Sequence, residues 1–518
     1  ERAPIALLEA QGDERIIPSD VIDQVITSFL RFKLLCQDAG VHHVRVIATE
    51  ATRIAVNAQE FLDRIHQATG WQVSLLSKQE EALISASGIV GMYTVILYVF
   101  IDAMAIGSFY QVNGLTMDLG GGSVEVSYVM MDPQAMRVSP HPVSMPFGAA
   151  ALKRKLAQCE SEEQVRALYE QVVAELQKAH DQAQLPESLC HPDGYDVYMS
   201  GGGFRALGYL SMAVNAQDTL LPRQSTNRKH MYPIPIINGY SISGKKLKAL
   251  AKFYRHKQPE ELIKKLKVFR ISKRRAGMIP ASCFLVSAIL KVYKIRRIYF
   301  SEGGVRQGFC YQLLSTAEKQ KDPFLEGVKA YAAQSPFSLS ETEYEAIDAI
   351  LVNALPPIYL DPKHPLQLHR LLPAAIHLSN LTSHYPKETR AFVAFHMPLA
   401  GGPLANVPGL SHRERAILSI LLTFRQGGSV PDPIFYAIQS LVGRRGVSVC
   451  KYIGRLMELV MQLRIRLPQH HSPLIDAPAI MSVIESIDKK VNTKKFDMDA
   501  EHRPLKCPNL FSVEVMRQ

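Results

Sequence analysis

The sequence is poor in cysteine and tryptophan, with seven Cys and one Trp among 518 residues. The odd number of cysteines and the absence of a C-x-x-C pair argue against a disulfide framework and against a structural zinc site, and they fit a reducing compartment. Tandem repeats and low-complexity tracts are also absent, which excludes a repeat architecture. The cysteines are scattered along the chain at Cys36, Cys159, Cys190, Cys283, Cys310, Cys450 and Cys507.

Long hydrophobic runs are missing as well. The apolar segment from Met92 to Ile106 is too short to span a bilayer and contains Asp102, so it does not predict a transmembrane helix. The first residues, ERAPIALLEAQ, lack the charged-then-apolar pattern of a signal peptide. We therefore expect a cytoplasmic protein without a membrane partner.

The composition, 47% hydrophobic and 21% charged, is that of an ordinary soluble protein, and the length allows two to four domains. The net charge of +11 is concentrated between Lys245 and Arg275, where thirteen Lys and Arg face two Glu. Such a run is usually a solvated helix face. Gathered on one surface, it would attract a nucleotide, polyphosphate or an acidic partner. Nucleic acid is disfavoured because few aromatic residues interleave with the charges.

The order of predicted elements indicates an α/β fold followed by a helical region. Helical patterns over 21–40, 58–70 and 78–90 alternate with strand patterns over 41–49 and 71–77. Beyond about residue 320, helical patterns dominate, at 340–355, 368–381, 411–425 and 446–463. We predict three domains, at 1–115, 116–317 and 318–518.

A glycine-rich stretch, LTMDLGGGSVEVSYV from Leu115, joins two strand patterns and predicts a β-hairpin. Glycines permit positive φ and let backbone N–H groups approach an anion closely, and Asp118 before them can hold a metal ion or orient a water. A tight hairpin without a ligand is an equal alternative from these residues alone. Similar loops follow strand patterns at Gly201–Gly203 and at Gly303–Gly304.

Five stretches in order carry a resemblance: VIATEATRIAVNAQEFLDRIHQATGWQVSLLSKQEEA, TMDLGGGSVEVSYV, VSMPFGAAALKRKL, YMSGGGFRALGYL and FSEGGVRQGF. Together they resemble the exopolyphosphatase/guanosine pentaphosphate phosphatase (Ppx/GppA) family. In their detailed sequence they are most similar to the fungal branch of that family, the retrograde regulation proteins, which are cytoplasmic signalling proteins. The resemblance implies two actin/sugar-kinase-like (ribonuclease H-like) lobes, followed by a mostly α-helical, degenerate HD-like C-terminal domain.

The resemblance also implies a site that binds phosphate chains. Glu81 matches the glutamate that activates the attacking water, a task that suits a carboxylate general base. Asp118 is the implied Mg²⁺ ligand. ATP, a guanosine polyphosphate or inorganic polyphosphate would fit the loops, and a protein partner in signalling is implied, with homodimer formation left open. The implied phosphate- or nucleotide-binding residues are Arg53, Asp118, Gly120, Gly121, Gly122, Ser123, Gly201, Gly202 and Gly203.

The sequence departs from the family pattern at charged positions. Leu83, Gly277 and Gln307 stand where an arginine, an aspartate and a glutamate of family motifs are expected. Loss of charged partners weakens charge stabilisation in a phosphate-cleaving site. His377 is followed by Leu378 instead of the aspartate of an HD metal pair, so we expect a packed histidine. The family's first phosphate loop is expected to lie ahead of Glu1.

The spacing of the motifs singles out one more segment. Glu81 and Asp118 are 37 residues apart, more than the family usually has, and removing about fifteen residues around Met92–Ile106 restores the spacing. The hypothesis is a translated, unspliced intron, and the alternative is an apolar insertion beside the cleft.

Three functions remain open. The favoured one is a phosphate- or nucleotide-binding signalling protein, because the binding loops persist while their charged neighbours differ from the family. The second is an active phosphoanhydride hydrolase, an exopolyphosphatase or pentaphosphate phosphatase with Glu81 as base. The third, a scaffold with an empty cleft, is least favoured.

Overall fold

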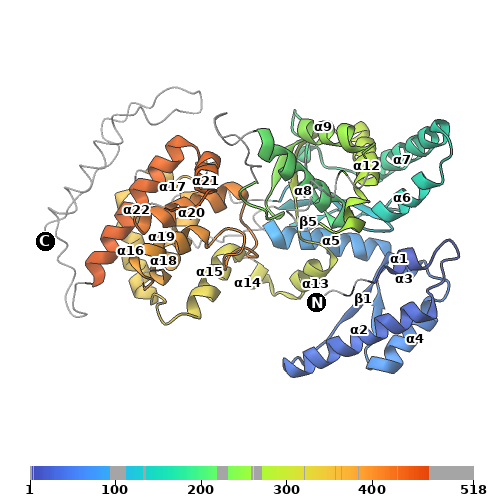
Figure 1. Ribbon diagram of the computed structural model, residues 1–518, viewed down its shortest axis with the longest axis horizontal. Helices are drawn as coiled ribbons and strands as arrows, with labels where there is room; N and C mark the ends of the chain where they lie inside the picture. The colour runs from blue at the N-terminus through green and yellow to red at the C-terminus, as the bar shows by residue number, and fades with distance from the viewer. Residues whose placement is uncertain are drawn as a thin grey trace. The chain divides into compact units, whose positions relative to one another are not determined.

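The structure is a computed structural model, and Figure 1 shows its elements in chain order. It describes residues 3, 5–93, 112–131, 136–218, 232–257, 261, 271–319, 321–355, 357–362, 364–382, 384–428 and 430–465. The chain divides into two compact units. The first contains residues 1–92, 112–214 and 240–315, and the second contains 93–111, 215–239 and 316–518. Each unit is described by itself.

The first unit begins with a small α/β part, drawn in blue in Figure 1. Its two strands, β1 and β2, pair in parallel, and helix α2 packs against α4. Phe61 and Ile65 of α4 meet Ile22 and Val25 of α2 in a common core. Helix α4 ends at Gly70, whose φ of 74° suits glycine. The elements are α1 (Leu7–Ala10), α2 (Ser19–Asp38), β1 (Val46–Ala48), α3 (Glu50–Arg53), α4 (Ala58–Thr69) and β2 (Val73–Leu75).

The larger sheet of the first unit has seven strands in the order β5-β4-β3-β7-β9-β8, with β6 also paired to β4. Strands β3, β7 and β9 run parallel, and β3 and β4 form the antiparallel hairpin that the sequence predicts. Leu115, Met117 and Leu119 of β3 are wholly buried, as expected of a central strand. The strands are β3 (Gly114–Leu119), β4 (Val124–Met131), β5 (Met136–Val138), β6 (Val143–Met145), β7 (Tyr195–Ser200), β8 (Ser241–Ser243) and β9 (Ile295–Phe300).

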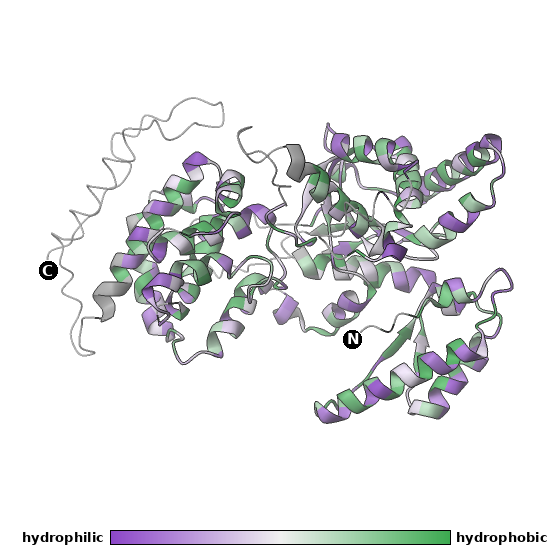
Figure 2. Cartoon of the chain, viewed as in Figure 1, coloured by the Kyte–Doolittle hydropathy of each residue, from purple (hydrophilic) through white to green (hydrophobic). Residues whose placement is uncertain are grey.

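Helices complete this unit. Helix α12 packs against α6, α7 and α9, and nine of its residues are buried. Polar and apolar residues alternate along α7 in Figure 2, and its buried face repeats at Leu168, Val172 and Leu176, four residues apart. The helices are α5 (Lys78–Tyr93), α6 (Ala149–Ala157), α7 (Glu162–Gln182), η1 (Glu187–Leu189), α8 (Gly201–Asp218), α9 (Gly244–Tyr254), α11 (Lys273–Ala276), α12 (Ile279–Val292) and α13 (Val305–Leu313).

One stretch of the described residues, Lys273–Val292, is long and apolar enough to cross a membrane by length and composition. Its most apolar window is 56% buried inside the first unit, and the core positions of α12 account for its hydropathy.

Glycines bring α5 and α13 into close contact. A β carbon at Gly308 of α13 would collide with the carbonyl oxygen of Ile84 in α5, and one at Gly88 would collide with the carbonyl oxygen of Gly304. Because neither helix can hold a larger residue at these positions, α5 is fixed relative to the end of β9.

The second unit is helical in the residues that the structure describes. The capping box of Ser340 and Glu343 starts α16, and that of Ser411 and Glu414 starts α20. The predicted helices 340–355, 368–381, 411–425 and 446–463 are confirmed as α16, α18, α20 and α22. The elements are α14 (Thr316–Lys319), α15 (Pro323–Ala333), α16 (Glu341–Ala354), α17 (Pro357–Leu360), α18 (Leu368–Leu381), α19 (Lys387–His396), α20 (His412–Arg425), α21 (Phe435–Val442) and α22 (Arg444–Ile465).

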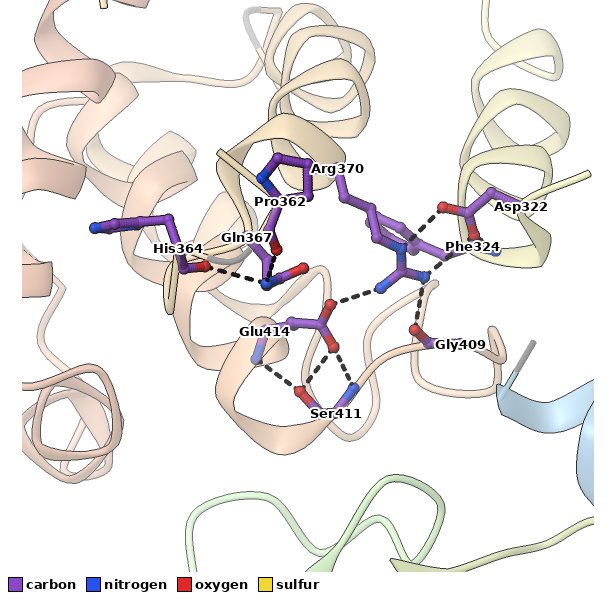
Figure 3. A network of polar contacts seen from close by, with 9 residues as sticks. All are labelled: Asp322, Phe324, Pro362, His364, Gln367, Arg370, Gly409, Ser411 and Glu414. Atoms are coloured by element: carbon purple, nitrogen blue, oxygen red, sulfur yellow. Dashed lines mark hydrogen bonds and ion pairs between the residues drawn. The ribbon is translucent and has the colours of Figure 1, made fainter. Parts of the chain in front are cut away.

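A buried ionic network joins three of these elements, and Figure 3 shows Arg370 of α18 between two acids. Its guanidinium donates to Asp322 at 2.9 and 3.1 Å and to Glu414 at 2.6 Å. The carbonyl oxygen of Gly409 accepts a fourth hydrogen bond at 2.7 Å. Since Glu414 also caps α20 through Ser411, the network ties the start of α20 to α15 and α18.

A short segment before β8 docks on α20 through His412. The Tyr232 hydroxyl lies 2.8 Å from His412 Nδ1, and His412 Nε2 lies 2.7 Å from the carbonyl oxygen of Ile236. A carbonyl can only accept, so Nε2 carries the proton and Nδ1 accepts from the tyrosine. Burial lowers the pKa of His412 to about 3 and keeps the ring neutral.

The strand predicted over 41–49 is only three residues long, Val46–Ala48, and it is half-buried, because it pairs with β2 alone in the described part of the chain. His377 is packed as predicted: it is buried and stacks on Tyr344 with the ring planes 2° apart. In the segment Met92–Ile106, for which an unspliced intron is the hypothesis, Met92 lies in α5 and 94–106 lies outside the described residues. The division at residue 115 stays a prediction.

Candidate phosphate-binding site

The loop between β3 and β4 is fixed by its own backbone. The amide of Gly120 donates to the carbonyl oxygen of Ser123 at 3.0 Å. The carbonyl oxygens of Gly120, Gly121 and Gly122 accept hydrogen bonds from the amides of Ala149, Ala150 and Gly148, at and before the start of α6. The loop therefore turns its carbonyl oxygens toward α6.

The glycines of the two loops differ in the space around them. A β carbon at Gly121 would meet only Leu8, at 3.9 Å, and one at Gly202 would meet nothing within 4 Å. In contrast, Gly201 has a φ of +88° and its β carbon would collide with the carbonyl oxygen of Leu119, while one at Gly203 would press on the Leu119 side chain at 2.5 Å. Gly201 and Gly203 are thus required by the fold, whereas Gly121 and Gly202 leave open space beside the backbone.

Asp118, near the end of β3, is held by two other elements. Its Oδ2 accepts a short hydrogen bond from the hydroxyl of Ser85 in α5. Burial raises the pKa of the Asp118 carboxyl above its ordinary value, and the Ser85 hydrogen bond and the positive charge of Arg205 in α8 oppose that rise. The side chain is therefore an acid whose charge depends on these two neighbours.

Glu81 pairs with the arginine that the sequence singled out. Arg53 Nη2 lies 2.9 Å from Glu81 Oε2 and 2.6 Å from Glu50 Oε2. Burial raises the pKa of Glu81, while the hydrogen bond and charge of Arg53 lower it. A carboxyl with a raised pKa in a cavity suits proton transfer near neutral pH.

A third carboxyl, that of Glu125, was not among the site residues predicted from the sequence. It stands directly opposite Asp118 in the β3–β4 register. Burial, with the charges of Asp118 and Glu81, raises the pKa of Glu125 to about 8, although Ser144 donates to it at 3.0 Å. An acid between Val124 and Val126 in a strand next to the glycine loop is a signal that could have revealed it.

These groups line one cavity of about 260 Å³. It brings together Glu81, Asp118, Gly120, Gly201 and Gly202 from the sequence-based set. The other lining residues were not among the predicted site residues, although the sequence analysis named Gly304 as part of a similar loop and Gln307 as a departure from the family pattern. They are Glu125, Ser200, Arg205, Glu302, Gly304, Val305, Arg306 and Gln307.

A second cavity, of about 540 Å³, borders the same glycine loops. It shares Gly120 and Gly202 with the first and has Arg274 and Arg275 in its lining. Its other lining residues are Ala3, Leu119, Gly121, Ala149, Gly203, Ser272 and Met278. Two arginines and, among the described residues, no carboxylate line it, which suits an anion, although Glu9 outside the lining pairs with Arg274 at 3.0 Å.

The remaining sequence-based residues lie nearby but line neither cavity in the described part of the chain. Arg53 reaches the site through its ion pair with Glu81. A β carbon at Gly122 would press on Glu50 at 2.9 Å, and Ser123 is buried with its side chain hydrogen-bonded to the Glu125 carboxyl.

The carboxyls of the first cavity provide only part of a metal site. Within the described ranges no group of three or more His, Cys, Asp or Glu is placed to hold a metal ion. Mg²⁺ commonly binds through one or two carboxylates together with phosphate oxygens and waters. The oxygen donors therefore fit a Mg²⁺ ion that arrives with a phosphate ligand, and they do not form a complete cage.

Comparison with known proteins decides the family. The model of the Ppx/GppA phosphatase family matches residues 1–317. The chain belongs to the Ppx/GppA phosphatase family. The remainder of this family member carries a second match, to the RTG2 C-terminal domain, over residues 331–464.

Relatives differ in how much of this Ppx/GppA chain they match. "Retrograde regulation protein 2" of Saccharomyces cerevisiae is 32% identical over 486 residues, which cover 89% of this chain and 75% of the relative. "Exopolyphosphatase 1" of Mycobacterium bovis is 26% identical over 158 residues, which cover 30% of this chain and 39% of that protein. The similarity to the retrograde regulation protein thus includes most of both chains.

Solved structures of the family also match. A Ppx/GppA family member from Aquifex aeolicus is 22% identical, covers 60% of this chain and 86% of its own, and gives a TM-score of 0.41. An exopolyphosphatase from Cytophaga hutchinsonii is 19% identical, covers 60% and 88%, and gives a TM-score of 0.44.

Proposed function

We propose that this protein is a phosphate- or nucleotide-binding signalling protein of the retrograde-regulation type, which uses the Ppx/GppA fold to sense its ligand. The observation that carries the proposal is the likeness to the yeast retrograde regulation protein, which spans both family matches, whereas the exopolyphosphatase likeness covers 30% of the chain. The open backbone at Gly121 and Gly202 supports it, because both glycines line a cavity.

The charges indicate how such a ligand would bind. Glu81, Asp118, Glu125 and Glu302 line the first cavity against two arginines, Arg205 and Arg306. Ionised carboxyls repel phosphate, so we propose that Mg²⁺ accompanies the phosphates and is held through Asp118. The second cavity, with Arg274 and Arg275, would take a further anionic part of ATP, a guanosine polyphosphate or polyphosphate.

An active phosphoanhydride hydrolase is the second candidate. It is favoured by one arrangement, the presence of Glu81 in the same cavity as Asp118 with a raised carboxyl pKa. Three departures weigh against it, since Leu83, Gly277 and Gln307 replace charged residues of family motifs.

The test separates binding from chemistry. Calorimetry with Mg·ATP and with polyphosphate would be combined with phosphate release for the wild type, Gly202→Ala and Glu81→Gln. A β carbon at Gly202 meets nothing within 4 Å and the residue lies in α8, so we expect Gly202→Ala to lose binding without destabilising the fold. Glu81→Gln should keep binding. Unchanged binding by Gly202→Ala would contradict the proposed site, and phosphate release abolished by Glu81→Gln would favour the hydrolase.

The proposal extends to context. We propose a cytoplasmic protein with a protein partner in signalling and no membrane or nucleic-acid ligand, and homodimer formation is left to size-exclusion measurements. We also propose that the helical domain derives from an HD-type fold that has lost its metal pair, since Leu378 follows His377.

A further inference from the structure

Ser85 and Glu81 lie one turn apart on α5 and are both buried. Residues four apart share one helix face, so α5 presents the candidate base and a hydroxyl to the same region. The hydroxyl of Ser85 donates to Oδ2 of Asp118, which belongs to β3. One face of α5 therefore supplies Glu81 and, through Ser85, also binds the carboxyl of Asp118 on β3.

The two oxygens of Asp118 have different neighbours. Oδ2 is engaged by Ser85, and Oδ1 lies beside Gly201, where a β carbon would collide with it. Gly201 opens the second glycine loop and lines the first cavity. The Ser85 hydrogen bond thus fixes the rotation of the carboxyl with one oxygen on α5 and the other at the glycine loop.

This hydrogen bond depends on the position of α5, and that position is well determined. Three residues after Ser85, Gly88 packs so closely on Gly304 that no β carbon fits. The carbonyl oxygen of the neighbouring Ile84 likewise leaves no room for a β carbon at Gly308 of α13. Because both contacts are backbone to backbone, Ser85 has a defined place from which to orient Asp118.

We propose that Ser85 is a positioning residue that orients Asp118 for a divalent cation bound together with phosphate. The inference rests on the proposed function. Removal of an outer group that orients a metal ligand typically lowers metal affinity about 10- to 100-fold.

Ser87 provides a matched control. It is a buried serine on the same helix. Its hydroxyl donates to the carbonyl oxygen of Leu83 at 2.9 Å and accepts from Gln312 of α13 at 3.3 Å, and neither partner is Asp118. It does not line either cavity in the described residues. Ser85→Ala and Ser87→Ala therefore remove the same atom from the same helix, and only the first frees Asp118.

The experiment measures Mn²⁺ binding by calorimetry in the presence of ATP, and ATP binding without metal, for the full chain. We expect Ser85→Ala to weaken Mn²⁺ binding about tenfold and Ser87→Ala to leave it unchanged. ATP binding without metal should be equal in both variants and in the wild type. Equal Mn²⁺ affinity in the two serine variants would overturn the positioning role.

A double-mutant cycle with Asp118→Asn distinguishes positioning from a general structural effect. If Ser85 acts through Asp118, Ser85→Ala adds no further loss of Mn²⁺ affinity in the Asp118→Asn background. A full additional loss there would overturn the inference. Failure of the wild-type chain to bind ATP, a guanosine polyphosphate or polyphosphate, with or without Mn²⁺, would overturn the proposed function as well. Binding that Ser85→Ala does not change overturns the positioning role alone.

Discussion

Asp118 and Glu125 stand opposite each other across the β3–β4 hairpin and line the same cavity, with Glu125 buried and Asp118 half-buried. Burial and the neighbouring charges raise the pKa of Glu125 from 4.5 to about 8. The folded protein therefore keeps a proton on Glu125 in a pH range in which the unfolded chain has released it. It follows that the free energy of unfolding falls as pH rises from about 4.5 to about 8.

Glu125→Gln should remove much of this dependence, because glutamine stays neutral. We expect the wild type to lose up to about 4 kcal/mol between pH 5 and pH 8 from this residue, and the variant to lose less. Urea unfolding at several pH values, followed by the fluorescence of the single tryptophan, Trp71, measures the slope in the first unit. Identical slopes in the two proteins would contradict the raised pKa. A remaining slope is expected from Asp118, whose pKa is also raised.

The sequence predicted the parts of this site that local patterns encode. Alternating apolar residues around Gly120–Gly122 predicted the hairpin, and helical periodicity with a final Gly70 predicted α4. Residues brought together by non-local pairing were harder to predict. Ser85 and Asp118 are 33 positions apart, and their contact depends on glycine packing between α5 and α13 that no periodicity reveals.

The helical unit shows the same limit. Its helices follow from their spacing and from capping boxes, but the partners of Arg370 lie 48 and 44 residues away. A lone arginine in an apolar helix pattern does not indicate which acids will neutralise it. Glu125 is different, because counting outward from the hairpin loop pairs it with Asp118, and this step could have been taken from the sequence.

Arg370→Met should destabilise the helical unit. The substitution leaves Asp322 and Glu414, which are 5% and 1% exposed, without their shared cation. Breaking a buried ion pair from one side typically costs about 3–5 kcal/mol. Hydrogen exchange read by mass spectrometry over α15, α18 and α20 would localise the loss of protection.

Arg166→Met, which removes an exposed pair with Glu170, is the control and should change stability by less than about 1 kcal/mol. Equal exchange in the two variants would refute the role of the network.

Arg53→Met tests how Glu81 is kept charged. The variant removes the hydrogen bond and charge that lower the pKa of Glu81, so the pKa should rise further. A carboxyl with a higher pKa costs more free energy to ionise in the fold, which makes the variant more destabilised at pH 8 than at pH 5.5. Trp71 fluorescence in urea at both pH values measures the difference. Adding Glu81→Gln should reduce the loss at pH 8, and a loss that is the same at both pH values would speak against this account.

Gly308→Ala tests the close contact between α5 and α13. In the middle of a helix alanine is intrinsically better than glycine by about 1 kcal/mol, so propensity alone predicts a more stable protein. The new β carbon would collide with the carbonyl oxygen of Ile84, and since both partners are backbone, neither can move aside without shifting a helix. Overpacking of this kind costs about 1–3 kcal/mol, and we expect net destabilisation in urea followed by Trp71 fluorescence. Gly277→Ala, at the C-cap of α11, is the control for the added β carbon, because that carbon would meet atoms no closer than 3.5 Å and the φ of Gly277 is −67°. A Gly308→Ala protein as stable as the Gly277→Ala protein would show that the two helices have room to separate, and Ser85 would then lose the fixed position from which it holds Asp118.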